Sequence, residues 1–269
     1  MGKINKLVTI TSLGGAAYAV VCGGFYFFQE KMLFKPSITP QDFEYSFLNA
    51  EELKIPVEKG IKLHALWFRK AENKKVIFYL HGYRGNMEKI GLLGEHYNAL
   101  GFDFFSFDYR GYGKSDGSIK SEKQFFDDAQ KVLDFVKQYY TNEQIIIVGY
   151  SLGSGTATYL SVHNQVNQLF LLAPYYSMLH MKKERNIRFI PDKVLKYPFE
   201  TNKWIQKVTV PITIFHGKDD VSISYKNSER LHRENPQIDV HWLENQGHSD
   251  LALNPILTEI MLQKINKNS

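Results

Sequence analysis

The sequence predicts an α/β fold, a mostly parallel, doubly wound sheet that is preceded by an antiparallel hairpin. Short apolar runs that end in glycine, at 74–82 and 102–111, are typical of strands buried on both faces of a parallel sheet. Segments with the apolar spacing of a helix separate such runs along the chain. The length of 269 residues is enough for one large domain of this kind.

Composition and charge exclude several functional classes. The net charge of +5 is spread over the chain and indicates a solvated or membrane-facing surface. No basic stripe interleaved with aromatic residues is present, so we expect no nucleic-acid partner. The single cysteine, Cys22, excludes an intrachain disulfide. Paired cysteines and the His-Glu-x-x-His motif are absent, so we expect neither a metal nor a cofactor.

The N-terminal residues 1–29 are predicted to be a single-pass membrane anchor. Leu7–Phe28 contains 22 residues without a charge, which is long enough to cross a bilayer as a helix. Lys3 and Lys6 precede this segment and weakly favour a cytoplasmic N-terminus, with the catalytic domain on the extracytoplasmic side.

Three other interpretations of this segment stay open. A cleaved signal peptide is possible, because Ala17-Tyr18-Ala19 offers a small-x-small cleavage site. Lipid attachment at Cys22 is another, although Val21 is a poor residue to precede a lipidated cysteine. A buried core helix fits less well, since the segment is terminal and apolar on all sides.

The first half of the remaining chain reads as a connector followed by strands. Pro36 and Pro40 favour an extended connector over 30–50, before a domain that spans 51–269. Alternation of apolar and polar residues about Gly60 predicts a hairpin. In order, the expected elements are the hairpin at 52–70, a strand at 74–82, a helix at Lys89–Leu100 and a strand at 102–111.

The second half continues the alternation and contains one long insertion. An amphipathic helix is predicted over 121–140, with one apolar face made by Phe125, Phe126, Ala129, Val132, Leu133 and Val136. The later elements are a strand at 144–150, a helix at 151–163, strands at 168–174 and 210–220, a helix at 222–232, a strand and loop at 238–250, and a helix from about Leu251. Tyr175–Val208 separates two strands by far more than a usual connection, so we expect a lid there.

A serine lies at the junction between a predicted strand and a predicted helix. Gly149-Tyr150-Ser151-Leu152-Gly153 fits the Gly-x-Ser-x-Gly pattern directly after the strand. In that context the glycines let strand and helix approach each other, and the serine hydroxyl is exposed on a strained turn. The pattern therefore predicts a nucleophile at Ser151, and an ordinary helix N-cap is the alternative.

A serine nucleophile needs a base and an acid, which follow it along the chain in this kind of fold. His248 lies in the loop after the last predicted strand, and Asp219 and Asp220 follow the strand before it. Both positions are at carboxyl ends of strands, where open α/β sheets bind ligands. The alternative position for the acid, after 168–174, holds no carboxylate until Glu184. His216 and His241 lie within strand patterns, so we interpret them as core or surface residues.

The chain from about Leu33 onward resembles the α/β-hydrolase superfamily, and within it the N-terminally anchored serine hydrolases described as α/β-hydrolase-domain or serine-aminopeptidase-like proteins. The resemblance depends on five segments in order, namely HGYRGN, DYRGYGKSDG, GYSLGSG, HGKDD and GHSDL. It implies an α/β-hydrolase fold with a short lid and selects Asp220 over Asp219 as the acid. His248 is the histidine that matches the last segment.

The resemblance also implies where an oxyanion would bind. It assigns the two backbone donors to Tyr83 and Leu152, and many relatives have a small residue or asparagine in place of Tyr83, so the tyrosine ring or hydroxyl would change the local geometry. The segment that holds Asp108, Arg110, Gly111 and Gly113 is expected to be structural.

The function expected from these residues is that of a serine hydrolase, in which Ser151 attacks an acyl carbonyl and Asp220 orients His248. An ester or thioester of moderate acyl length is the first expectation, because of the apolar residues in 175–208 and the predicted membrane anchor. A peptide or amide substrate and a catalytically silent, membrane-tethered binding protein are the alternatives. A dehalogenase or epoxide hydrolase would require an aspartate at position 151.

Overall fold

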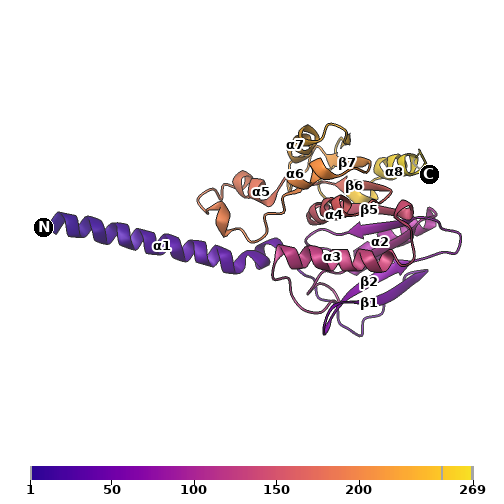
Figure 1. The fold of residues 1–269 in the computed structure, drawn as a ribbon, viewed down its shortest axis with the longest axis horizontal. Helices are drawn as coiled ribbons and strands as arrows, with labels where there is room; N and C mark the ends of the chain where they lie inside the picture. The colour runs from indigo at the N-terminus through magenta and orange to yellow at the C-terminus, as the bar shows by residue number, and fades with distance from the viewer. Residues whose placement is uncertain (1, 250, 268–269) are drawn as a thin grey trace.

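The computed structural model describes the backbone of residues 2–249 and 251–267, and side chains from Leu13 onward (Figure 1). In this part of the chain an eight-stranded sheet has the order β1-β2-β4-β3-β5-β6-β7-β8. Its strands are β1 (Ala50–Glu58), β2 (Ile61–Phe68), β3 (Val76–Leu80), β4 (Asp103–Phe107), β5 (Ile145–Tyr150), β6 (Gln168–Leu172), β7 (Ile212–Gly217) and β8 (Asp239–Leu243). β2 pairs antiparallel with β1 and β4, and the remaining neighbours are parallel. The predicted sheet with its leading hairpin is confirmed.

Helices cover both faces of the sheet and enclose two hydrophobic cores. On one face lie α2 (Met87–Ala99) and α8 (Pro255–Lys267), and on the other lie α3 (Glu122–Val136) and α4 (Leu152–His163). In β3, Phe78 faces the core with α3 and α4, whereas its neighbours Ile77 and Tyr79 face the other core. Strands buried on both faces explain why these segments are apolar without alternation.

The amphipathic pattern of α3 predicted its packing correctly. The six apolar residues of the predicted face are all buried against the sheet. Ser121 caps the helix, because its side chain accepts a hydrogen bond from the amide of Gln124 at 3.1 Å.

Two predicted helices begin later than expected. The helix predicted from position 222 is α7 (Lys226–Glu234), because the amides of Ser222 and Ile223 donate to a carboxylate instead of entering a helix. The closing helix α8 begins at Pro255, after the short 3₁₀ helix η4 (Leu251–Leu253). Asp250, at the end of the predicted loop, lies outside the described residues.

The long connection between β6 and β7 is an ordered insertion, which we call the β6–β7 insertion (175–208). It contains α5 (Met178–Glu184), η2 (Asp192–Val194), α6 (Thr201–Trp204) and η3 (Ile205–Lys207). The only other short 3₁₀ helix in the described chain, η1 (Asn142–Gln144), precedes β5. In Figure 1 the insertion lies on the side of the body from which the N-terminal helix projects.

The N-terminal segment is one continuous helix, α1 (Gly2–Leu33), which continues past residue 29. Exposed apolar side chains follow much of its described length, among them Leu13, Val20 and Val21. Nevertheless, no helix of the described chain is both long and apolar enough to cross a membrane, so the predicted transmembrane span is not found. Glycine, alanine and tyrosine lower the mean hydropathy of the described part, which begins at Leu13. The side chains of residues 2–12 lie outside the description.

Candidate active site

Ser151 lies on a strained turn between β5 and α4. Its backbone has φ of 53° and ψ of −116°, in the left-handed half of the map that non-glycine residues rarely occupy. Such a conformation costs on the order of 1–3 kcal/mol and persists only where the surroundings hold it. One such contact is the hydrogen bond from the Ser151 amide to the carbonyl of Leu172 on β6, at 2.9 Å.

The two flanking glycines are required because α4 approaches the sheet closely. A Cβ atom at Gly149 would lie 2.5 Å from the Cβ of Ala157, and one at Gly153 would lie 2.1 Å from the carbonyl oxygen of Leu80. Any side chain at either position would push α4 away from β3 and β5. The Gly-x-Ser-x-Gly pattern is therefore explained by packing around the serine, as expected for a strand-turn-helix junction.

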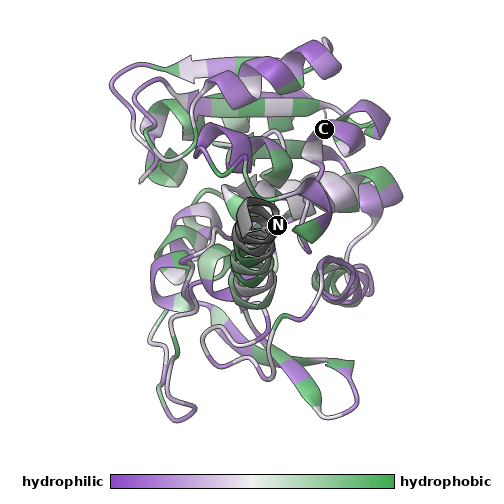
Figure 2. Ribbon diagram, turned by 90° about the vertical axis from the view of Figure 1, so that its left-hand side faces the viewer, coloured by the Kyte–Doolittle hydropathy of each residue, from purple (hydrophilic) through white to green (hydrophobic). Residues whose placement is uncertain are grey.

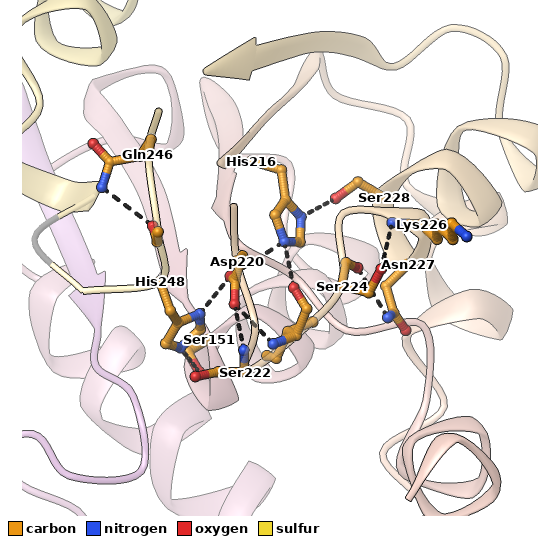
Figure 3. A network of polar contacts seen from close by, with 12 residues as sticks. Ser151, His216, Asp220, Ser222, Ser224, Lys226, Asn227, Ser228, Gln246 and His248 are labelled. Carbon is orange, nitrogen blue, oxygen red and sulfur yellow. Dashed lines mark hydrogen bonds and ion pairs between the residues drawn. The ribbon is translucent and has the colours of Figure 1, made fainter. Parts of the chain in front are cut away.

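The structure brings Ser151, His248 and Asp220 into one line of hydrogen bonds (Figure 3). Nε2 of His248 lies 3.0 Å from Oγ of Ser151, and Nδ1 lies 2.6 Å from Oδ2 of Asp220. These partners assign the tautomer of His248: Nδ1 donates to the carboxylate, so Nε2 is free to accept the hydroxyl proton. The hydroxyl of Tyr150 donates to the carbonyl of His248 at 2.6 Å and fixes the loop.

Asp220 is the carboxylate that faces His248, whereas the neighbouring Asp219 is exposed. Oδ1 of Asp220 accepts from the amides of Ser222 and Ile223 at 2.8 and 2.9 Å. Burial by itself would raise the pKa of this carboxyl. Hydrogen bonds from two imidazoles and from the Ile223 amide outweigh burial and hold the pKa of Asp220 below its ordinary value. The group is therefore ionised at neutral pH and can stabilise a positive charge on His248.

His216 is the residue of this network that sequence reasoning did not identify. It is fully buried at the end of β7, and its Nε2 lies 3.3 Å from Oδ2 of Asp220 and 2.9 Å from the carbonyl of Ile223. Because the Ile223 carbonyl can only accept, Nε2 is assigned the proton, and Nδ1 accepts from the hydroxyl of Ser228 at 2.6 Å (Figure 3). His216 thus positions Asp220. The spacing of four residues between His216 and Asp220 was the one feature of the sequence that could have indicated this contact.

Other candidates in the sequence lie outside this network. His241 contacts Asp239 at 2.9 Å, and Glu184 holds His180 at 3.0 Å and Asn227 at 3.3 Å. In the segment expected to be structural, Arg110 binds Asp128 through two nitrogens, at 2.5 and 2.9 Å. In that segment Gly113 has a φ of 48° and lies against the carboxylate of Asp108.

The two candidate oxyanion donors both line the cavity beside Ser151. Leu152 is the first residue of α4, where a backbone amide has no partner within the helix. The carbonyl of Tyr83 accepts from the Tyr112 hydroxyl at 2.9 Å and the Lys35 amide at 3.2 Å, which fixes this loop next to the serine.

A cavity of about 560 Å³ lies above Ser151 and His248. Its lining comes from α1, from the β6–β7 insertion and from the loop after β7, and most of these side chains are apolar. In the part of the chain that the structure describes, no group of three or more His, Cys, Asp or Glu side chains could hold a metal ion. Ser151 and His248 line the cavity, and the charged residues Lys35, Lys182, Glu184 and Arg185 also belong to its lining.

Comparison with known proteins finds similarity to α/β hydrolases. Residues 71–201 match the family model described as serine aminopeptidase, S33. A protein of Acanthamoeba polyphaga mimivirus that is named as an α/β hydrolase is 27% identical over 250 residues, which cover 88% of this chain and 91% of the relative. The α/β hydrolase domain-containing protein 17C of Xenopus tropicalis is 27% identical, over 79% of this chain and 69% of that protein.

A solved structure agrees with the fold. The structure of an esterase from Pyrococcus furiosus superposes with a TM-score of 0.65 at 18% identity, over 87% of this chain and 98% of that chain. At this identity the likeness is evidence for the shared fold alone.

Proposed function

We propose that this chain belongs to the α/β-hydrolase superfamily and is a serine hydrolase that cleaves acyl esters or thioesters through a covalent intermediate on Ser151. The observation that carries the proposal is the hydrogen-bonded line from Ser151 through His248 to Asp220, whose first two residues line a mostly apolar cavity. A nucleophile, a base and an ionised acid in this order are the groups that acyl transfer needs.

The acylation step moves one proton and exchanges one bond. Nε2 of His248 takes the hydroxyl proton as Oγ of Ser151 forms a bond to the acyl carbon. His248 then donates that proton to the leaving oxygen or sulfur, whose bond to the acyl carbon breaks. Asp220 holds the imidazole in the required tautomer and stabilises its charged form. A water molecule, activated by the same histidine, releases the acyl group and restores the serine.

The backbone amides of Tyr83 and Leu152 are proposed to bind the oxyanion that develops in both steps. Both residues border the cavity next to Ser151. Donors aimed at a developing oxyanion contribute about 3–4 kcal/mol each to lowering the barrier.

An amide or peptide substrate is the second candidate, favoured by the family model that is described as serine aminopeptidase. An aminopeptidase would need a carboxylate to hold the substrate's amino group. Among the described residues that line the cavity, the carboxylate is Glu184, and His180 and Asn227 already occupy it. The apolar lining therefore favours an acyl substrate.

A membrane is the proposed location and partner of this enzyme. The exposed apolar side chains of α1 would enter a lipid surface and leave the body in water. Flotation of the full-length chain with phosphatidylcholine vesicles tests this proposal, and a chain that stays in the bottom fraction would contradict it. We also propose that the body lies on the extracytoplasmic side of the membrane. Protease protection in intact cells tests this location.

Hydrolysis of p-nitrophenyl esters from acetate to palmitate tests the proposed activity. We expect hydrolysis by the full-length protein and a decrease of at least about 10³-fold in kcat for Ser151→Ala, as for nucleophile substitutions in related chemistry. Ser118→Ala, at an exposed serine, is the matched control and should retain activity. Equal inactivity of the unchanged protein and Ser151→Ala on all esters would leave amide cleavage or simple binding as the function.

A further inference from the structure

One wall of the cavity above Ser151 belongs to the N-terminal helix. Phe25, Gln29, Met32 and Leu33 of α1 line the cavity together with Ser151 and His248. Their spacing of four, three and one residues places them on one face of the helix. The segment interpreted from the sequence as an anchor and connector thus reaches the candidate active site.

The β6–β7 insertion forms another part of the lining, to which it contributes the apolar residues Met178, Met181, Ile187 and Leu195. Methionine and branched aliphatic side chains offer a surface for hydrocarbon without requiring hydrogen bonds. Figure 1 shows α1 and the insertion extending from the same side of the body, and Figure 2 views α1 along its axis against that body. The lining of the space above the serine is therefore mostly apolar, and the charged residues Lys35, Lys182, Glu184 and Arg185 make up part of it.

Hydrogen bonds fasten α1 to the insertion. Gln29 is 1% exposed, and its amide group donates to the carbonyl of Val194 and accepts from the backbone amide of Lys196, both at 2.8 Å. A buried primary amide with both ends paired to backbone groups fixes the distance between two segments. About two turns before Phe25, the hydroxyl of Tyr18 donates to the carbonyl of Phe189 at 2.7 Å.

Charged and aromatic contacts at the end of α1 support the same arrangement. Glu30 accepts from Nζ of Lys196 at 3.0 Å and from the hydroxyl of Tyr197 at 2.9 Å. Directly after the helix, the buried ring of Phe34 packs edge-on against Tyr197, with ring centroids 5.2 Å apart. The wall is therefore part of the folded body, and its position is set by several independent contacts.

We propose that the last turns of α1 are a specificity-determining part of the substrate site, which binds the distal part of a long acyl chain between α1 and the insertion. The proposal rests on the function proposed above. A volume of about 560 Å³ is in the usual range of about 300–1,000 Å³ for small-molecule sites. An acetyl group would occupy only its floor, whereas a chain of twelve or more carbons would reach the α1 wall.

Matched substitutions on α1 in the full-length protein test the proposal. Phe25→Ala removes an apolar ring from the wall, and Met32→Trp fills the space beside it. Phe28 is the control position, because it lies between them on the helix, is 55% exposed and does not line the cavity. Each variant is assayed for kcat/KM on p-nitrophenyl acetate, octanoate, dodecanoate and palmitate at one fixed detergent concentration.

We expect Phe25→Ala and Met32→Trp to lower kcat/KM for dodecanoate and palmitate by about tenfold or more, as for lost or blocked apolar contacts in other pockets. The acetate value should change by less than about threefold, since its acyl group does not reach the wall. Phe28→Ala and Phe28→Trp should leave the whole profile unchanged. Retained acetate hydrolysis shows that the two cavity variants are folded.

Two results would contradict the proposals separately. If the cavity variants keep the chain-length profile of the unchanged protein, α1 does not bind the acyl chain and this inference is wrong, although the esterase activity stands. If the unchanged protein hydrolyses no ester and a fluorophosphonate probe does not label Ser151, the proposed function itself fails and the inference with it.

Discussion

Two regions meet at the cavity, and they are held by different kinds of contact. The floor, formed by Ser151, Asp220 and His248, is fixed by backbone hydrogen bonds, by the buried imidazole of His216 and by glycines that allow close approach. The helical wall, formed by the last turns of α1 and the β6–β7 insertion, is held by side chains that reach across from segments far apart in the sequence.

This difference separates the chemistry of the cavity from its selectivity. At the floor a displacement of less than 1 Å breaks the line of proton transfer, so few substitutions are tolerated. At the wall an apolar side chain can be replaced by another of different size with loss of some substrates only. Substitutions that affect every substrate equally should therefore map to the floor, and substitutions that depend on acyl length should map to the wall.

Asp220→Asn is the sharpest test of the floor. We expect kcat to fall by about 10⁴-fold for every acyl length, because the amide no longer stabilises the charged imidazole or the required tautomer. Asp219→Asn is the matched control and should retain most activity, since the Asp219 side chain is exposed. Full-range ester kinetics with both variants measure the effect, and similar losses in the two would exclude the assignment of Asp220.

Gln29→Leu tests the wall and leaves Ser151, Asp220 and His248 unchanged. Leucine has a similar size but cannot pair with Val194 and Lys196, so α1 should loosen from the insertion. We expect a decrease of about tenfold in kcat/KM for palmitate and less than threefold for acetate. Gln138→Leu, at an exposed position on the body, is the control. A uniform loss for all esters would instead connect Gln29 with the floor.

Glu122 joins the body to the insertion and gives the smallest expected effect. Burial, with a contribution from the nearby Glu200, raises the pKa of this carboxyl from its ordinary value to about 7, and the hydrogen bond from the Phe199 amide at 2.6 Å only partly opposes the shift. Because the folded-state pKa is raised, the stabilisation is complete below about pH 4.5 and is lost as the pH rises through 7.

Thermal unfolding between pH 5 and pH 8.5 measures this loss. For the unchanged protein we expect Glu122 to account for about 1 kcal/mol, reduced by partial solvent exposure, or a decrease of about 2–4 °C in Tm. Glu122→Gln should lack this part of the pH dependence, and Glu259→Gln, at an exposed position on α8, should retain it. Identical pH profiles for the Glu122→Gln variant and the unchanged protein would contradict the raised pKa.

The mostly parallel sheet with its leading hairpin and the position of Ser151 after a strand could be predicted, because each depends on local pattern. Apolar runs identify buried strands, and two glycines around a serine identify the close approach of a helix. The residue pattern could not distinguish Asp219 from Asp220, because loop geometry does not follow alternation, and the resemblance to a family was needed. The contacts of Asp220 with amides at 222 and 223 also explain why the predicted helix there begins later.

The role of Gln29 could not be predicted from the sequence. Its partners, Val194 and Lys196, are 165 and 167 residues away, and no periodicity connects a polar residue at the end of an apolar segment with a distant loop. His216 was interpreted as a core or surface residue because it lies within an apolar strand pattern. Its strand pattern is apolar and local, whereas its function depends on Ser228 and Asp220, which only the turn after β7 brings close.

The unbroken course of α1 has a geometric consequence. Phe25 lies 23 residues after Gly2 in the same helix, which corresponds to roughly 35 Å at 1.5 Å per residue. The last turns are hydrogen-bonded to the insertion, so the helix fixes both the distance and the rotation about its axis between its first turn and the cavity. Two extra residues within it would turn everything before them by about 200° about the axis while the length grew by only about 3 Å. The cavity is therefore held in one fixed orientation relative to whatever the first turns of α1 contact. A flexible linker could not maintain that orientation.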